Sequence, residues 1–128
     1  MTLGKIQSIG VDVVDVQRMK EVLERQGKPF LDKIFSDMEV TYCRTRKKSY
    51  IHFAARFAAK EAVAKAMRTG WSGAFHWRDI EVVNDQSGAP HILLSREVAK
   101  ALEQCNVHLS LSHTDNTVVA FVVLESKK

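Results

Sequence analysis

The chain has 128 residues, of which 45% are hydrophobic and 27% are charged, and its formal net charge is +4. These values fit one globular domain spanning residues 1–128 and exclude a chain that is mainly disordered. The mild positive charge is compatible with a nucleic acid, a phosphate-rich cofactor or an acidic protein as partner, or it serves only to keep the protein soluble.

The first predicted elements are a strand and a helix. Residues 5–16 are rich in β-branched apolar side chains, which favours a strand, and Asp12 and Asp15 interrupt them. From residue 16 to residue 26, apolar side chains recur three or four positions apart, which predicts a helix that ends at Gly27.

Two helical segments precede the centre of the chain. Residues 30–35 are a short apolar stretch compatible with a helical turn, and Ser36 followed by Glu39 forms a capping-box pattern for a helix that runs toward Thr45. The alanine-rich segment 49–69 is the strongest helix of the sequence, because alanine has the highest helix propensity, and we expect Gly70 to end it.

The C-terminal half alternates predicted strands with one helix. The expected elements are a hairpin of residues 79–84 and 91–94, a helix over 95–104 capped by Ser95, and strands over 107–112 and 117–124. Incomplete alternation in the last strand predicts burial on both of its faces. The sum is an α+β fold, a mostly antiparallel sheet packed on one long helix.

The two cysteines have no CxxC spacing and no disulfide framework, which suggests a reducing environment. The N-terminus does not resemble a secretory signal, and no apolar run approaches the ~20 residues that cross a bilayer. We therefore expect a soluble, cytoplasmic protein.

Three polar features suggest chemistry. Asp12 lies inside an apolar strand, where a carboxylate without a partner or a metal is costly to bury, although it could equally face water at a sheet edge. Glu61 and Lys65 are four apart and share a helix face, as Arg56 and Lys60 do. Glu–Lys pairs at this spacing are, however, often solvent-exposed side chains without a functional role. His113 ends a strand and could bind phosphate, or could simply be exposed.

Other sites fit less well. Zinc-ligand spacings and the glycine-rich nucleotide-binding loops are absent, and Ser112 and His113, as neighbours in a strand, point to opposite faces. Two carboxylates suit Mg²⁺, which is commonly held by one or two carboxylates together with substrate phosphates.

The order of motifs resembles the holo-[acyl-carrier-protein] synthase family, the short bacterial type of 4'-phosphopantetheinyl transferase. The resemblance covers residues 6–125. It rests on Ile9-Gly10-Val11-Asp12, Arg18, Arg56-Phe57-Ala58-Ala59-Lys60-Glu61, Lys65-Ala66, Thr69-Gly70, Asp79-Ile80-Glu81-Val82, Gly88-Ala89-Pro90 and His108-Leu109-Ser110-Leu111-Ser112-His113-Thr114.

The resemblance implies an enzyme that moves 4'-phosphopantetheine from coenzyme A to a serine of an apo acyl carrier protein, by default in fatty-acid synthesis. It implies a homotrimer with active sites between subunits. The roles it implies are metal binding by Asp12 and Glu61, phosphate or leaving-group chemistry for Lys65, coenzyme A contacts for Arg56, Lys60 and His113, and a carrier-protein contact for Arg18. Glu61 or a metal-bound water would accept the proton of the serine hydroxyl.

This chain departs from the family at Asp15, where a glutamate is frequent. It also diverges over residues 26–50, where the basic run 46–48 falls in a region in which the family often has lysine or arginine. Two other functions remain open. One is a catalytically silent module that binds coenzyme A or a carrier protein. The other is a nucleic-acid-binding domain, which the positive charge alone suggests.

Overall fold

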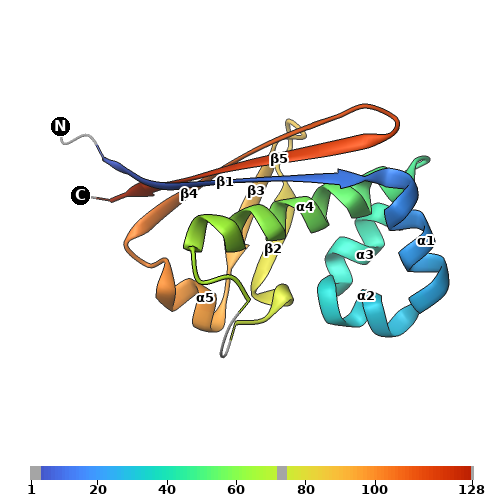
Figure 1. Ribbon diagram of the computed structural model, residues 1–128, viewed down its shortest axis with the longest axis horizontal. Helices are drawn as coiled ribbons and strands as arrows, with labels where there is room; N and C mark the ends of the chain where they lie inside the picture. The colour runs from blue at the N-terminus through green and yellow to red at the C-terminus, as the bar shows by residue number, and fades with distance from the viewer. Residues whose placement is uncertain (1–3, 72–74, 128) are drawn as a thin grey trace.

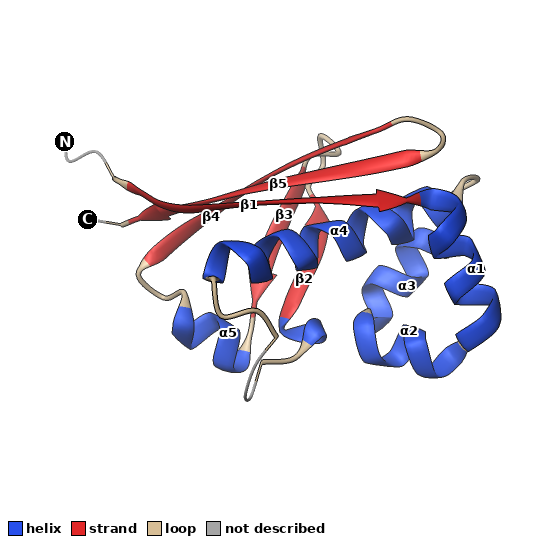
Figure 2. Cartoon of the chain, viewed as in Figure 1, coloured by secondary structure: helices blue, strands red, loops and turns tan. Residues whose placement is uncertain are grey.

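The computed structural model describes residues 4–71 and 75–127, in which one long helix lies against antiparallel strands (Figures 1 and 2). The elements are β1 (Ile6–Asp15), α1 (Val16–Gln26), α2 (Lys28–Ile34), α3 (Asp37–Arg44), α4 (Ser49–Met67), the 3₁₀ turn η1 (Trp77–Asp79), β2 (Ile80–Asn84), β3 (Pro90–Leu94), α5 (Arg96–Ala101), β4 (Cys105–His113) and β5 (Thr117–Ser126). Helices α1 to α3 gather beside the N-terminal end of α4, and both chain termini lie at the other end of the molecule (Figure 1).

The strands form a three-stranded sheet in the order β1-β5-β4 and a separate two-stranded sheet of β2 and β3. All pairs are antiparallel, with Asp12 opposite Ala120 and His113 opposite Val118. Helix α4 packs on one face of the larger sheet (Figure 2). The predicted α+β class, with a mostly antiparallel sheet on one long helix, is therefore confirmed.

One face of the larger sheet is uncovered. The residues of β5 that face α4 are buried, whereas Phe121 on the opposite face is 41% exposed. The prediction that this strand is buried on both faces is wrong for the single chain, because α4 covers only one side. The exposed face continues onto β1, where Ile9, Val11 and Val13 are 58%, 48% and 62% exposed.

Close contact between α4 and the sheet depends on small side chains. Most alanines of α4 are buried, and Gly10 of β1 lies directly beneath the helix. A Cβ atom at Gly10 would lie 2.0 Å from the carbonyl oxygen of Ala62, so only glycine fits there. The helix ends at Met67, before the expected Gly70, because Arg68 takes the left-handed conformation with φ 68°.

The predicted capping box of α3 is confirmed. The backbone N–H of Glu39 donates to Ser36 Oγ at 3.2 Å, and the backbone N–H of Ser36 donates to Glu39 Oε1 at 2.9 Å. Helix α5 is shorter than expected, and Ser95 precedes it without a side-chain cap bond. Among the helices of the described residues, none combines the length and apolarity that crossing a membrane would require.

Candidate functional site

Asp12 lies on the face of β1 that is turned toward α4. Alternation along the strand places it on the same side as the buried Gly10, and its side chain is 14% exposed. It is therefore a nearly buried carboxylate beside the long helix. Although β1 is an edge strand, the Asp12 side chain is turned toward α4 and is largely shielded from water.

Lys65 of α4 meets this carboxylate. Its Nζ donates to Asp12 Oδ1 at 2.9 Å and to the carbonyl oxygen of Val11 at 3.1 Å, and the lysine side chain is 54% exposed. Glu61 lies one turn earlier on the same helix face and accepts a hydrogen bond at its Oε1 from the indole Nε1–H of Trp71 at 2.8 Å. The fold thus brings Lys65 to Asp12 where β1 and α4 meet, and Glu61 lies one helical turn from Lys65 on the same face.

The oxygen donors at this place fit a hard divalent cation. In the parts of the chain that the structure describes, no group of three or more His, Cys, Asp or Glu side chains could hold a metal. Asp12 and Glu61 would supply two carboxylates, and the remaining ligands would come from a phosphate substrate or water. This sharing is typical of Mg²⁺.

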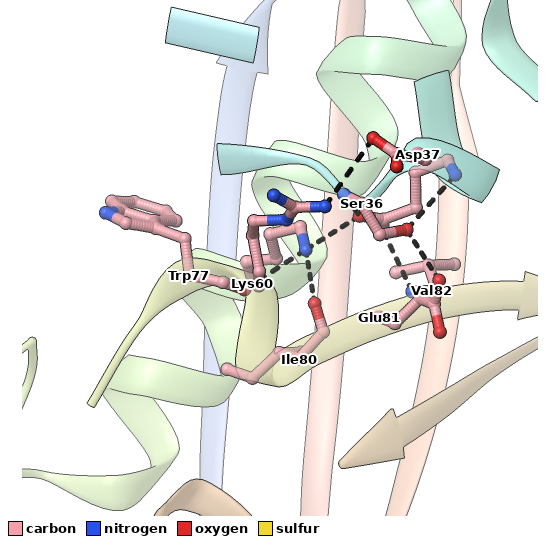
Figure 3. Close-up of polar contacts among 9 residues, drawn as sticks. Ser36, Asp37, Lys60, Trp77, Ile80, Glu81 and Val82 are labelled. Carbon is pink, nitrogen blue, oxygen red and sulfur yellow. Dashed lines mark hydrogen bonds and ion pairs between the residues drawn. The ribbon is translucent and has the colours of Figure 1, made fainter. Parts of the chain in front are cut away.

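Lys60 is part of the core. Its side chain and that of Glu39 are both 0% exposed, and they form an ion pair at 2.9 Å. The ammonium also donates to the carbonyl oxygens of Trp77, at 3.2 Å, and Ile80, so its three protons are used (Figure 3). Burial lowers the pKa of Lys60, and the charge of Glu39 opposes that shift. This arrangement argues against the predicted contact of Lys60 with coenzyme A.

The Glu39 carboxylate joins three elements. Besides capping α3 and binding Lys60 of α4, its Oε2 accepts the backbone N–H of Val82 in β2 at 2.9 Å. Ser36 extends the network by donating its hydroxyl to Glu81 at 2.5 Å (Figure 3). The buried pair therefore fixes how α4 sits against α3 and β2.

A cluster of cationic and aromatic groups occupies the N-terminal half of α4. The guanidinium carbons of Arg56 and Arg46 each lie 4.2 Å from the ring centroid of Tyr42, and His52 approaches that ring edge-on. Burial lowers the pKa of His52 below its ordinary value, and the charges of Arg56, Arg46 and His113 lower it further. His113 is exposed at the end of β4 and acts on His52 only through this charge.

Arg56 has a hydrogen-bond donor that the described residues leave unused. Its side chain is nearly buried, and one terminal nitrogen donates to Asn84 Oδ1 at 2.7 Å. Among the described residues, its Nε is a buried donor without a hydrogen-bond acceptor. A buried unsatisfied donor is costly, so a phosphate oxygen placed here would gain a strong interaction.

The carboxylates and the cationic cluster do not form one site within a single chain. Asp12 lies on β1 and His113 on β4, which are the two edge strands of the sheet. Arg56 and Glu61 are five residues apart on α4, so they project about 140° apart around the helix axis. Arg18, the predicted carrier contact, is exposed on α1.

Sequence reasoning missed several of these residues. Trp71 and Tyr42 belong to no motif of the sequence, Arg46 stands out only as part of the basic run 46–48, and the capping-box pattern indicates only one of the roles of Glu39. Asp15 is the N-cap of α1 and accepts the backbone N–H of Arg18 at 2.9 Å. Its position immediately before the amphipathic segment was the signal that identifies such a cap.

Comparisons with known proteins show to which family the chain is similar. The family model described as the 4'-phosphopantetheinyl transferase superfamily matches residues 8–122. A holo-[acyl-carrier-protein] synthase of Geobacter sp. (strain M21) is 42% identical over 94% of this chain and 98% of its own length.

Two solved structures are also similar. The holo-[acyl-carrier-protein] synthase of Neisseria meningitidis has a TM-score of 0.87 at 36% identity, covering 94% of this chain and 99% of that chain. The Bacillus anthracis enzyme, solved in complex with CoA (3',5'-ADP), has a TM-score of 0.80 at 36% identity, covering 94% and 97% of the two chains.

Proposed function

This chain belongs to the 4'-phosphopantetheinyl transferase superfamily, among the holo-[acyl-carrier-protein] synthases, and we infer from that premise what it does. It is an enzyme that transfers 4'-phosphopantetheine from coenzyme A to a serine of an apo acyl carrier protein, giving the holo carrier and 3',5'-ADP. The observation that carries this conclusion is the agreement in sequence and fold over nearly the whole chain with relatives of that name, one of them solved with coenzyme A.

The proposed roles in the reaction follow from the junction of β1 and α4. Asp12 and Glu61 would hold a divalent metal ion, which when bound neutralises the charge of the coenzyme A pyrophosphate and polarises its phosphorus. Lys65 presents an ammonium beside Asp12 and would stabilise the charge that builds on the departing 3',5'-ADP. The acceptor of the serine proton remains either Glu61 or a water molecule.

The cationic cluster is the proposed place for the remaining phosphate of coenzyme A. Arg56 offers its free Nε–H donor there, and His113 and Arg46 add positive charge nearby. The charge of this cluster suits a dianionic phosphomonoester such as the 3'-phosphate, which guanidinium groups bind well.

A homotrimer with sites between subunits is the proposed assembly. Asp12 and His113 lie on opposite edge strands of the sheet, and Arg56 and Glu61 point in different directions from α4, so one chain would supply the carboxylates and its neighbour the cationic cluster. The uncovered apolar face formed by Ile9, Val11, Val13 and Phe121 supports burial against another subunit. On β5, Phe121 and Val123 lie on this outer face, whereas Val118 lies in the core of the chain.

Mixing two inactive variants tests the shared site. Glu61→Gln removes a proposed metal ligand, and Arg56→Ala removes the proposed phosphate contact. If each site combines the two halves from different subunits, unfolding and refolding the variants together restores activity, because some sites then receive both intact halves. Mixtures that remain inactive while the trimer re-forms would contradict sharing, and a monomer by sedimentation would contradict the assembly itself.

The proposed carrier contact is electrostatic. Acyl carrier proteins of this kind are acidic, and the exposed Arg18 together with the net charge of +4 would speed their approach. A fatty-acid synthesis carrier is the proposed substrate, and a cytoplasmic location stays a prediction. Replacing Arg18 by alanine should raise KM for the carrier and leave the affinity for coenzyme A unchanged.

The function itself is tested by mass spectrometry. The protein is incubated with coenzyme A, Mg²⁺ and a panel of apo carriers, and each carrier should gain the mass of one 4'-phosphopantetheine group. The alternative of a silent module predicts coenzyme A binding by calorimetry without any gain of mass. The nucleic-acid alternative predicts a salt-sensitive shift with DNA or RNA and no coenzyme A binding.

A further inference from the structure

The carboxylate of Glu61 is held by a side chain that the proposed reaction does not yet use. Trp71 follows α4, ten residues after Glu61, and its Nε1–H donates to Glu61 Oε1 at 2.8 Å. We propose that Trp71 is a positioning residue that fixes the Glu61 carboxylate in the orientation in which it binds the divalent metal. This inference rests on the proposed function, in which Glu61 is a metal ligand.

The chemistry of the indole suits that role. An indole N–H is a donor only, so Trp71 can orient a carboxylate but cannot itself bind a cation or compete for one. The bond occupies one lone pair of Oε1 and leaves Oε2 available. A hydrogen bond to a charged acceptor is stronger than a neutral one. The glutamate side chain therefore loses rotational freedom before the metal arrives, and metal binding need not overcome that entropy.

Trp71 is itself held in place by stacked rings. Its ring stacks on Trp77 at 4.1 Å between centroids, and Trp77 stacks on Phe57 at 5.1 Å. Phe57 lies one helical turn before Glu61, so the row of rings starts on α4, and Trp71 at its other end bonds back to the same helix through Glu61. The Trp71 ring that bonds to Glu61 is thus held by a stack of rings that starts at Phe57 of α4.

The buried ion pair secures the middle of this row. Lys60 donates to the carbonyl oxygen of Trp77 at 3.2 Å, which ties the backbone of η1 to α4. Figure 3 shows the Trp77 ring turned away from this network. Lys60 and Glu61 are therefore linked through the aromatic rings. Lys60 fixes the backbone at Trp77, Trp77 stacks on Trp71, and Trp71 donates to Glu61.

The direct test is the affinity for Mn²⁺, used as a paramagnetic probe and measured by electron paramagnetic resonance in the presence of coenzyme A. Trp71→Phe keeps an aromatic ring for the stack and removes only the N–H donor. We expect its Kd for Mn²⁺ to rise about ten-fold, as is usual when a partner that orients a metal ligand is lost. The matched control, Trp77→Phe, makes the same change where no bond to Glu61 exists, and its Kd should stay within about two-fold.

Two further readouts separate positioning from a general loss of structure. Turnover of Trp71→Phe should recover at high Mg²⁺, because saturating metal compensates for weaker binding but not for a damaged fold. In Trp77→Phe, Trp71 is the sole tryptophan, and its fluorescence should change when Mn²⁺ is added with coenzyme A. That change should disappear when Glu61→Gln is added to the same chain.

The outcomes distinguish this inference from the proposed function. If Glu61→Gln loses Mn²⁺ affinity while Trp71→Phe binds like the unaltered chain, the positioning role is wrong and the metal site stands. If Glu61→Gln also binds Mn²⁺ normally, the assignment of Glu61 as a ligand fails and this inference fails with it. A Trp71→Phe chain whose turnover does not recover with metal contradicts positioning as well.

Discussion

Removing one partner of the buried pair formed by Glu39 and Lys60 should be among the most damaging single changes in this protein. Glu39→Gln conserves shape but removes the negative charge, and it leaves the fully buried ammonium of Lys60 without a counter-charge. The carboxylate also accepts the backbone N–H groups of Ser36 and Val82, and an amide can accept only with its single oxygen.

The magnitude follows from these contacts. Breaking a buried ion pair by removing one partner costs about 3–5 kcal/mol, because the remaining charge stays desolvated and unpaired. A domain is stabilised by about 5–15 kcal/mol in total, so Glu39→Gln should remove a third or more of the stability. Lys60→Met leaves the Glu39 charge unpaired in the same way and should cost a similar amount.

The double variant provides the decisive comparison. Once both charges are gone, no unpaired buried charge remains. The double variant should therefore lose less free energy of unfolding than the sum of the two single losses, by about 1–3 kcal/mol. The assay is urea unfolding followed by far-ultraviolet circular dichroism, at one fixed chain concentration so that any subunit association contributes equally. Additive losses, or a cost of less than about 1 kcal/mol for Glu39→Gln, would refute the reasoning.

The remaining predictions concern packing, thiols and pH. Gly10→Ala should destabilise the protein by about 1–3 kcal/mol or more and lower Tm in calorimetry, because its Cβ would lie 2.0 Å from a carbonyl oxygen of α4. Burial raises the pKa of Cys43 to about 12, so a thiol reagent at pH 8 should label only Cys105 in the native protein and both thiols in urea. Burial lowers the pKa of His52 below its ordinary value of 6.5, so the unfolded chain binds a proton more readily than the folded chain as the pH falls, and acidification lowers the stability. In His52→Gln, the free energy of unfolding should therefore decrease less between pH 7 and pH 5 than in the unaltered chain.

Local sequence signals predicted most elements because they depend on neighbouring residues. The alanine-rich composition of α4 and the capping box of Ser36 and Glu39 each act within a few positions, and both are present as expected. The sequence predicts that Gly70 ends α4, but the helix ends earlier, at Met67, because Arg68 already adopts the left-handed conformation. That choice depends on the packing of the following loop, which a local pattern does not contain.

The sequence motifs name the residues of the candidate site, and the contacts among those residues appear only in the structure. The motif around Glu61 located the proposed metal ligand and Lys65, and the structure brings Lys65 to Asp12 across 53 positions of sequence. Spacing alone could not separate Lys60 from Lys65, since both are lysines on one helix. Burial separates them, because Lys60 is enclosed with Glu39 whereas Lys65 is half exposed.

The central claim is tested most directly by the initial rate at which an apo carrier gains 4'-phosphopantetheine, measured by mass spectrometry at increasing Mg²⁺. Glu61→Gln and Asp12→Asn are compared with the unaltered chain after all three are shown to have the same circular dichroism spectrum. We predict a rate that depends on the metal in the unaltered chain and falls by orders of magnitude in both variants. A rate that persists in a chelator, or one that either variant retains in full, would contradict the proposed metal site at Asp12 and Glu61.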